Sequence, residues 1–264
     1  GWIARFLQAD ELAYAKGDAS QAYQSKETGE EYSVVKNFRH LVMLKPDVVL
    51  VYDELEATKE VDWSWLIHSL EEMTIDENNQ TFAVQLENGA GKGRLWASED
   101  LTFHLSDTFE VAAVNWRKTL KEDGSLKSYK DNQYHLKASS TSKAAKMRFF
   151  AVIQAGKVVK DTELMEGKIE NGIATIKIGD WNITANLASE IEPGLQIHNE
   201  ATETVFSSHG NSLQLRDQIF SGEHPGSTRM GIIKDNSPLF LEIKDQFPNE
   251  MISRFNYFQK GQQK

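Results

Sequence analysis

The sequence predicts an all-β protein, built as a layered, supersandwich-like antiparallel β-sandwich with a small C-terminal β extension. Runs of β-branched and large apolar residues recur along the chain, and helical periodicity is nearly absent. The strongest run, residues 38–69, is apolar on both faces of its expected strands. An antiparallel sheet that is buried on both faces needs another layer on each side, so these observations together favour a layered sandwich.

Length and composition are those of a soluble globular protein of one large domain with a small appendage. The chain has 264 residues, of which 40% are hydrophobic and 26% charged. We expect a large antiparallel β-sandwich over 1–190 and a smaller C-terminal β region over 191–264, with a soft boundary near Ile191–Gly194. The chain has no cysteine, which excludes disulfides and thiolate metal sites.

The charge balance excludes two classes of partner. The formal net charge is −10, so the surface repels nucleic acid and anionic membranes. No run of about 18 apolar residues is present to span a membrane. We therefore expect neither nucleic acid nor a membrane as partner.

The organising stretch begins as a hairpin around Lys45-Pro46-Asp47-Val48. Proline presets φ at the first central position of a turn, and aspartate tolerates the second. With Pro46 and Asp47 as a two-residue loop, His40 lies opposite Asp53. The run from Val61 to Ser69 would then add a third strand to the same sheet.

The remaining strands follow from alternation and turn residues. Two short strands are expected within 1–16, followed by one helical turn that Asp18 caps. The glycine-rich residues 87–93 are expected to connect two strands, and Gly179-Asp180 is expected to form a tight hairpin turn. The further expected strands are 81–86, 94–98, 101–105, 109–116 in part, 134–138, 147–154, 168–169, 173–178 and 181–185, with short ones near 205, 213, 231 and 239.

One set of residues has the chemistry of a metal site. Under the expected register His40 and Asp53 come within reach of each other, and a neighbouring strand could add His68. Two imidazoles and one carboxylate suit zinc. The alternative is a buried hydrogen-bonded pair of His40 and Asp53, with His68 elsewhere, and the spacing favours this alternative.

Several aromatic residues are candidates for contact with a sugar. Trp63 and Trp65 share one face of a strand and could stack on a sugar ring, although such a pair is more often part of a core. Two aromatic–cation pairs near loop ends are candidates for substrate binding, with surface packing as the alternative. These pairs are Arg94 with Trp96, and Trp116 with Arg117.

Residues 1–69 resemble the heparinase II/III-like polysaccharide lyases, in the stretches G-W-I-A-R-F, Y-A-K-G-D-A-S-Q-A-Y, F-R-H-L-V-M-L-K-P-D-V-V-L-V-Y-D-E-L-E-A and W-L-I-H. The resemblance extends weakly to about Ala185. It implies a chain in which an (α/α) toroid domain precedes a large antiparallel β-sandwich. This sequence would then be the C-terminal β-sandwich portion of a longer protein, with the toroid as its partner.

The resemblance also implies a reaction, β-elimination on an acidic polysaccharide. A tyrosine or histidine removes the C5 proton of a uronic acid, and a metal or other group neutralises the adjacent carboxylate. The motifs that carry these roles in the family are not present here, so we expect no catalytic residue. The resemblance also argues against His40, Asp53 and His68 as the family's metal site. No cofactor is expected in this portion, and a divalent metal is an open alternative for the full-length parent.

The sequence thus leaves three functions open. The favoured one is a non-catalytic β-sandwich that supports the substrate cleft of a bacterial polysaccharide lyase, periplasmic or secreted, acting on heparin/heparan-like or alginate-like chains. The alternatives are a free-standing carbohydrate-binding module and a purely structural β domain. The residues expected to meet the acidic polysaccharide are Arg39, Arg94, Trp96, Trp116 and Arg117.

Overall fold

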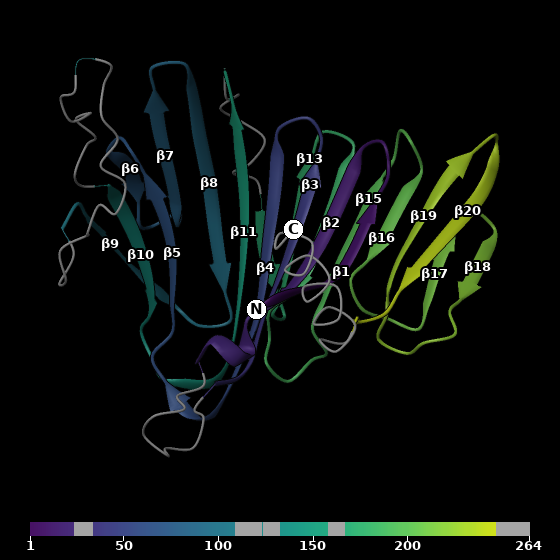
Figure 1. Ribbon diagram of the computed structural model, residues 1–264, viewed down its shortest axis with the longest axis horizontal. Coiled ribbons are helices and arrows are strands. Elements are labelled where there is room, and N and C mark those ends of the chain that lie inside the picture. Colours follow the sequence, from purple (N-terminus) through teal and green to yellow (C-terminus); the bar gives the residue numbers. More distant parts are fainter. Residues whose placement is uncertain (24–33, 109–122, 124–132, 158–166, 247–264) are drawn as a thin grey trace.

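The computed structural model describes residues 1–23, 34–108, 123, 133–157 and 167–246 (Figure 1). The described chain is an all-β, sandwich-like fold in which antiparallel sheets form layers, and its single short helix there is η1 (Ser20–Tyr23). The expected cap of this turn is confirmed, because the Ser20 amide donates to Asp18 Oδ1 at 2.9 Å. None of the described helices is long and apolar enough to cross a membrane.

An eight-stranded sheet forms the central layer. Its strand order is β1-β2-β3-β4-β11-β8-β7-β6, and every neighbouring pair is antiparallel. Its strands are β1 (Trp2–Gln8), β2 (Leu12–Asp18), β3 (Val34–Leu44), β4 (Val48–Val61), β6 (Met73–Asp76), β7 (Thr81–Leu86), β8 (Gly89–Ala97) and β11 (Ala144–Gly156).

Smaller sheets lie on both faces of the central sheet. A three-stranded sheet of order β5-β10-β9 covers part of one face, which we call the outer face, and a seven-stranded sheet covers the other, the inner face. The first consists of β5 (Ser64–Ser69), β9 (Leu101–Ser106) and β10 (Tyr134–Ser140), and the second of β12 (Gly167–Glu170), β13 (Ile173–Ile178), β14 (Trp181–Asn186), β15 (Gly194–Asn199), β16 (Thr204–Ser207), β19 (Thr228–Lys234) and β20 (Ser237–Ile243). A separate pair joins β17 (Ser212–Leu215) and β18 (Gln218–Ser221).

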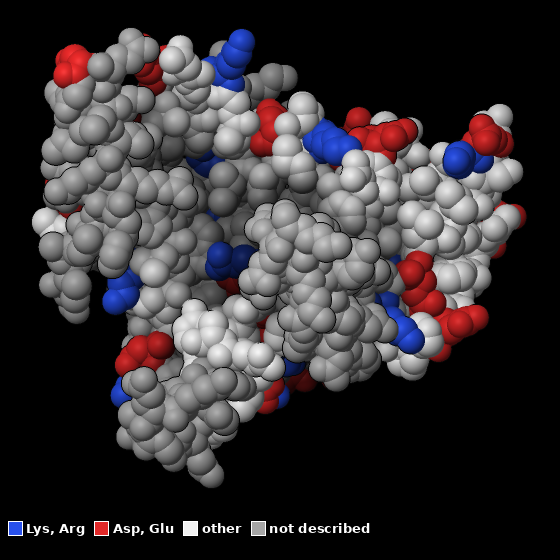
Figure 2. Space-filling view, in the orientation of Figure 1, with Lys and Arg blue, Asp and Glu red and all other residues white. Residues whose placement is uncertain are grey.

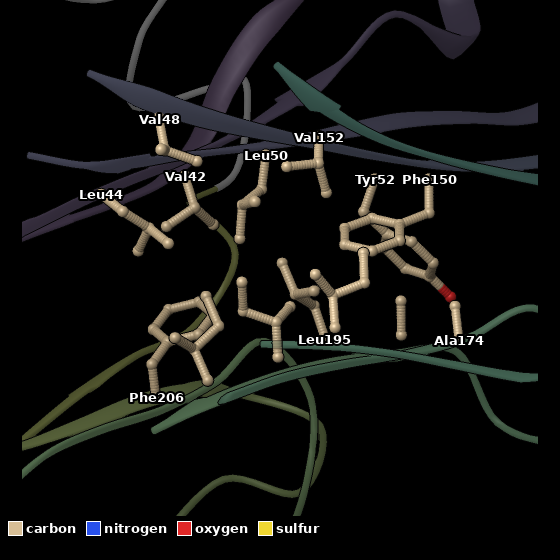
Figure 3. Close-up of a cluster of buried hydrophobic side chains, with 14 of the residues drawn as sticks. Val42, Leu44, Val48, Leu50, Tyr52, Phe150, Val152, Ala174, Leu195 and Phe206 are labelled. Atoms are coloured by element: carbon tan, nitrogen blue, oxygen red, sulfur yellow. The ribbon is translucent and has the colours of Figure 1, made fainter. Parts of the chain in front are cut away.

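Two apolar cores hold the layers together. Figure 3 shows the inner core, where side chains of β3, β4 and β11 meet those of the seven-stranded sheet. The outer core joins β4, β7, β8 and β11 to the three-stranded sheet. Trp63 and Trp65 are buried there, at 8% and 4% exposure, so the interpretation of this pair as core is confirmed.

The expected hairpin of β3 and β4 is present, but its predicted register was wrong by one residue. Leu44 pairs with Val48, so the loop has three residues rather than two. Side chains alternate between faces along a strand, so this slip changes every cross-strand partner. His40 lies opposite Tyr52, and Asp53 lies opposite Arg39.

Two further expectations were wrong. β5 was expected beside β4 but joins the three-stranded sheet. The glycines at 89–93 were expected in a connection but belong to β8 itself, where Gly93 leaves space for the Phe82 ring of β7. The boundary expected near residues 191–194 lies between the paired strands β14 and β15, and the division into two regions stays a prediction. The expected hairpin at Gly179 is confirmed, with Ile178 paired to Trp181 and Gly179 at φ +55°.

Candidate functional site

A polar pocket opens at one end of the inner face, beyond the apolar core. Inner-face positions of β3, β4 and β11 change there from apolar to charged, and the loop after β14 forms the facing wall. The pocket has a volume of about 260 Å³. We call it the Glu54 pocket; its charged lining residues are Lys36, Glu54, Glu56, Lys146, Arg148, Glu190 and Glu192.

A buried chain of hydrogen bonds supports Glu54 from behind. The hydroxyl of Tyr14 lies 2.9 Å from His40 Nδ1, and His40 Nε2 lies 2.8 Å from Glu54 Oε1. Nε2–H donates to the Glu54 carboxylate, and the tautomer of His40 decides whether the Tyr14 hydroxyl or Nδ1 donates in the other contact. Tyr14 and His40 are 1% and 2% exposed, so β2, β3 and β4 present these side chains to each other rather than to solvent.

The environment keeps Tyr14 protonated and Glu54 ionised. Burial raises the pKa of Tyr14 above its ordinary value. Burial by itself also raises the pKa of Glu54, but the hydrogen bond and charge of His40, with the charges of Lys36 and Lys16, outweigh it and lower this pKa to about 2. Glu54 is therefore a carboxylate at neutral pH.

Lys36 and Arg148 of the pocket already have partners. Lys36 Nζ lies 3.8 Å from Glu54 and 3.9 Å from Glu56. The guanidinium of Arg148 donates to backbone carbonyls of the facing loop, at 2.6 Å for Ala188 and 2.5 Å for Ile191. Arg148 thus ties the central sheet to the seven-stranded sheet. An incoming anion would compete with these contacts, and the cations placed to meet it are Lys36, whose side chain is 34% exposed, and Lys146, which is exposed.

A second ionic cluster borders the same end of the sandwich. Asp245 accepts from Arg5 at 2.6 Å and from Lys16 at 3.1 Å. The Lys16 ammonium also lies 4.0 Å from the centre of the Phe38 ring. Burial lowers the pKa of His209, which is half-buried nearby and feels the charges of Glu54 and Arg5.

The sugar-binding residues expected from the sequence do not come together. Arg39 lies on the outer face of β3 and forms a bidentate ion pair with Asp53, with two distances of 2.7 Å. Arg94 and Trp96 lie on β8, and the guanidinium sits 4.9 Å from the indole centre. Trp96 belongs to the inner core and is 4% exposed.

The other two expected residues, Trp116 and Arg117, lie outside the described residues. The same holds for the whole of the strand expected in part of 109–116. Their role in substrate binding stays a prediction.

The proposed metal set of His40, Asp53 and His68 was wrong, and so was its alternative of a His40–Asp53 pair. His40 bonds to Tyr14 and Glu54, while Asp53 bonds to Arg39. His68 lies on β5 with its ring centre 5.9 Å from that of His135. Within the described part of the chain, no group of three or more histidine and acidic side chains is placed to hold a metal ion.

Sequence reasoning missed Tyr14, Lys36, Glu54 and Arg148. A signal for Glu54 was present in Asp53-Glu54-Leu55-Glu56, where acidic residues follow a buried apolar run within one strand. Such a position needs a partner, because an unpaired buried charge is costly. The identity of that partner depends on the register, which the turn sequence did not determine.

Comparison with known proteins gives matches to solved structures alone. No family model and no curated protein matches the chain. Similar structures include a heparinase III gene product, with 10% identity over 92% of this chain and a TM-score of 0.46. Heparan sulfate lyase HepC from Pedobacter heparinus gives 6% identity over 93% of this chain and a TM-score of 0.43. A further heparinase III structure gives 11% identity over 75% of this chain and a TM-score of 0.44.

This chain spans about a quarter of the length of these proteins, with 27%, 28% and 26% of their chains covered. At such identities and scores the function has to be argued from the residues of the chain itself.

Proposed function

We propose that this chain is the C-terminal β-sandwich portion of a bacterial polysaccharide lyase, periplasmic or secreted, that acts by β-elimination on a uronic-acid-containing polysaccharide of heparin/heparan or alginate type. Its role is to support one wall of the substrate cleft, next to an upstream α/α toroid domain. The catalytic base belongs to the toroid, as the resemblance in residues 1–69 implies. We expect no cofactor in this portion, and a divalent metal is an alternative for the full-length parent.

The observation that carries the non-catalytic role is the burial of the Tyr14–His40–Glu54 chain. A lyase base must come within hydrogen-bond distance of the sugar C5 proton. Tyr14 is 1% exposed, and both ring nitrogens of His40 are hydrogen-bonded within the protein. Tyrosine and histidine are the residue types that serve as the base in such an elimination. Here, however, their hydrogen bonds position the carboxylate of Glu54, which in turn lies beside the Lys36 ammonium.

The charge distribution favours a role as one wall of the substrate cleft over a role as an independent polysaccharide-binding site. Among the described residues on the face shown in Figure 2, basic and acidic side chains are interspersed without a large area of one sign. In the Glu54 pocket, Lys36 is likewise paired with acids and Arg148 with backbone carbonyls. A polyanion held by so few free cations should bind weakly and dissociate as salt rises.

The carbohydrate-binding module is less well supported. It would use Trp96, Trp116 or the pair Trp63 and Trp65 to stack on sugar rings. Trp63, Trp65 and Trp96 are all buried in the two cores. Of that set, Trp116 alone lies outside the described residues.

The first test is activity. The chain is incubated with heparin, heparan sulfate and alginate, and the unsaturated product is followed by its absorbance. We expect no turnover on any of them. Turnover by this chain alone would show that the base lies within it.

The second test is binding, measured by titration calorimetry with heparin at low and at physiological salt. We expect weak binding that disappears as the salt concentration rises. Tight binding that survives physiological salt would contradict the proposal and favour the carbohydrate-binding module.

In the longer parent protein, Lys36→Ala should raise KM more than it lowers kcat. The control is Lys168→Ala, which replaces an exposed lysine on β12 and should change neither constant.

A further inference from the structure

The outer face of the central sheet is covered over only part of its width. The outer core draws on β4, β7, β8 and β11, where the three-stranded sheet lies against them. Beyond it, β1, β2 and β3 carry apolar side chains on the same face. Phe6 pairs with Ala15, and Ala15 pairs with Leu41, so the three form one row across these strands.

This row is exposed to an unusual degree. Phe6 is 53% exposed and Leu41 42%, and Ile3 near the end of the same face is 57% exposed. In the neighbouring row Ala13 pairs with Met43. We call the surface formed by Ile3, Phe6, Ala13, Ala15, Leu41 and Met43 the β1–β3 patch. A contiguous apolar patch of this kind marks a surface that something else covers.

The described chain ends beside this patch. After β20, Asp245 is held by Arg5 of β1 and Lys16 of β2. The amide of Gln246 then donates to the carbonyl of Ala4, in the edge strand β1, at 2.9 Å. These contacts place Gln246 at the free edge of the central sheet, beside β1.

The residues that follow have the composition of an occupant for the patch. Residues 247–264 read F-P-N-E-M-I-S-R-F-N-Y-F-Q-K-G-Q-Q-K, with apolar residues at 251, 252, 255 and 258. This spacing is that of one face of an amphipathic helix, after a proline and an asparagine suited to a helix start. The segment contains one Glu and three Lys or Arg, in a chain of net charge −10.

The segment after Gln246 is long enough to cross the β1–β3 patch. Neighbouring strands lie about 4.8 Å apart, so β3 is roughly 10 Å from β1. Eight helical residues span about 12 Å, which matches the width of three strands.

We propose that segment 247–264 packs its apolar face, Met251, Ile252, Phe255 and Phe258, on the β1–β3 patch and so completes the outer layer. The three-stranded sheet then covers one half of the central sheet's outer face, and this segment covers the other half. The ion pairs of Asp245 set the direction in which the segment leaves β20.

The absence of cysteine from the sequence permits a clean test in the full chain. Phe6→Cys places a single thiol in the patch, and its reaction rate with a maleimide reports access to it. The control thiol is Ile219→Cys on β18, a residue that is 66% exposed and belongs to a separate sheet. Each is made alone and together with Phe255→Ser and Phe258→Ser.

We expect Phe6→Cys to react several-fold more slowly than Ile219→Cys, and to approach the control rate once both phenylalanines are replaced. The control rate should not change. Urea unfolding curves for all four proteins show that each is folded.

Three outcomes would overturn the proposal. A rate at Phe6→Cys that equals the control in both backgrounds means that the patch is open. A slow rate that persists after the replacements means that another part of the chain covers it. A slow rate that rises on dilution of the protein means that a second copy covers it.

Discussion

Leu41 and Val51 are cross-strand neighbours on the outer face of the central sheet, yet their surroundings differ. Val51 is 6% exposed because the three-stranded sheet covers it, whereas Leu41, one strand further out, is 42% exposed. Both are large aliphatic residues in apolar runs. The difference teaches that burial of a residue in this sheet is decided by the extent of the neighbouring layer and not by the local sequence.

The largest expected effect is that of Val51→Asp. An unpaired carboxylate in the outer core costs several kcal/mol, against a total stability of about 5–15 kcal/mol for a typical domain. We expect no cooperative unfolding transition in a thermal melt followed by circular dichroism. Leu41→Asp, the matched change on the partly covered side, should retain a transition. Melting curves for Val51→Asp like those of the unmodified chain would contradict the assignment of the outer core.

The same contrast can be tested on the inner face, with Trp96 and Arg94 of β8. Trp96→Ala removes a core indole, and we expect a loss of about 3–5 kcal/mol in the free energy of unfolding. Arg94→Ala removes a cation–π contact at the rim, for which about 0.5–1 kcal/mol is expected. Urea denaturation measures both. Equal losses would show that Trp96 is not a core residue.

Glu54→Gln sharpens the comparison at the polar end of the inner face. The pKa of Glu54 in the folded state, about 2, lies below the ordinary value of 4.5. A lowered pKa stabilises the fold when the carboxylate is ionised, so this contribution is complete above pH 4.5 and is lost as the pH falls toward 2. We expect Glu54→Gln to cost about 3 kcal/mol at pH 7 and little at pH 2.

This expectation is checked by urea unfolding of both proteins across that pH range. Glu200→Gln, an exposed carboxylate on the seven-stranded side, is the matched control and should give a small loss at each pH. A loss for Glu54→Gln that stays constant with pH would contradict the interaction of the ionised Glu54 carboxylate with His40 and Lys36.

The smallest effects are expected for Leu41→Ser in the β1–β3 patch and for Ile219→Ser on β18. Leu41 is 42% exposed in the described structure, so even with segment 247–264 packed on the patch the loss should be about 1 kcal/mol in urea denaturation, well below that of Trp96→Ala. Ile219→Ser, on a two-stranded sheet, should change the free energy of unfolding by less than about 0.5 kcal/mol. A loss at Leu41 as large as that at Trp96 would mean that the patch is a full core.

The all-β class and the layered arrangement were both predicted correctly from the sequence, because each depends on patterns that extend over only a few neighbouring residues. The apolar run on both faces of β4 requires two covering layers, and both layers are present there. The hairpin at Gly179 and the cap at Asp18 follow equally from local turn chemistry.

The candidate site was predicted poorly because it depends on register. Taking the loop at Pro46 as two residues instead of three placed His40 opposite Asp53, when its partner is Glu54. Likewise Arg39 and Arg94 look alike in sequence, but they lie on opposite faces of the central sheet. The local sequence of β3 or of β8 does not determine which of its two faces the seven-stranded sheet covers.

The position of β11 has a consequence for how this protein is made. It lies between β4 and β8 in the sheet and pairs with both. In the chain, however, six described strands (β5 to β10) separate it from β4, and two of these (β9 and β10) separate it from β8. Until β11 has emerged from the ribosome, the strands β4 and β8 each present an unpaired edge flanked by apolar faces. Such edges recruit other chains, and pairings of long sequence separation form slowly. Nascent chains that stop before residue 144 should therefore aggregate, and chains that include β11 should be the first to reach a closed central sheet.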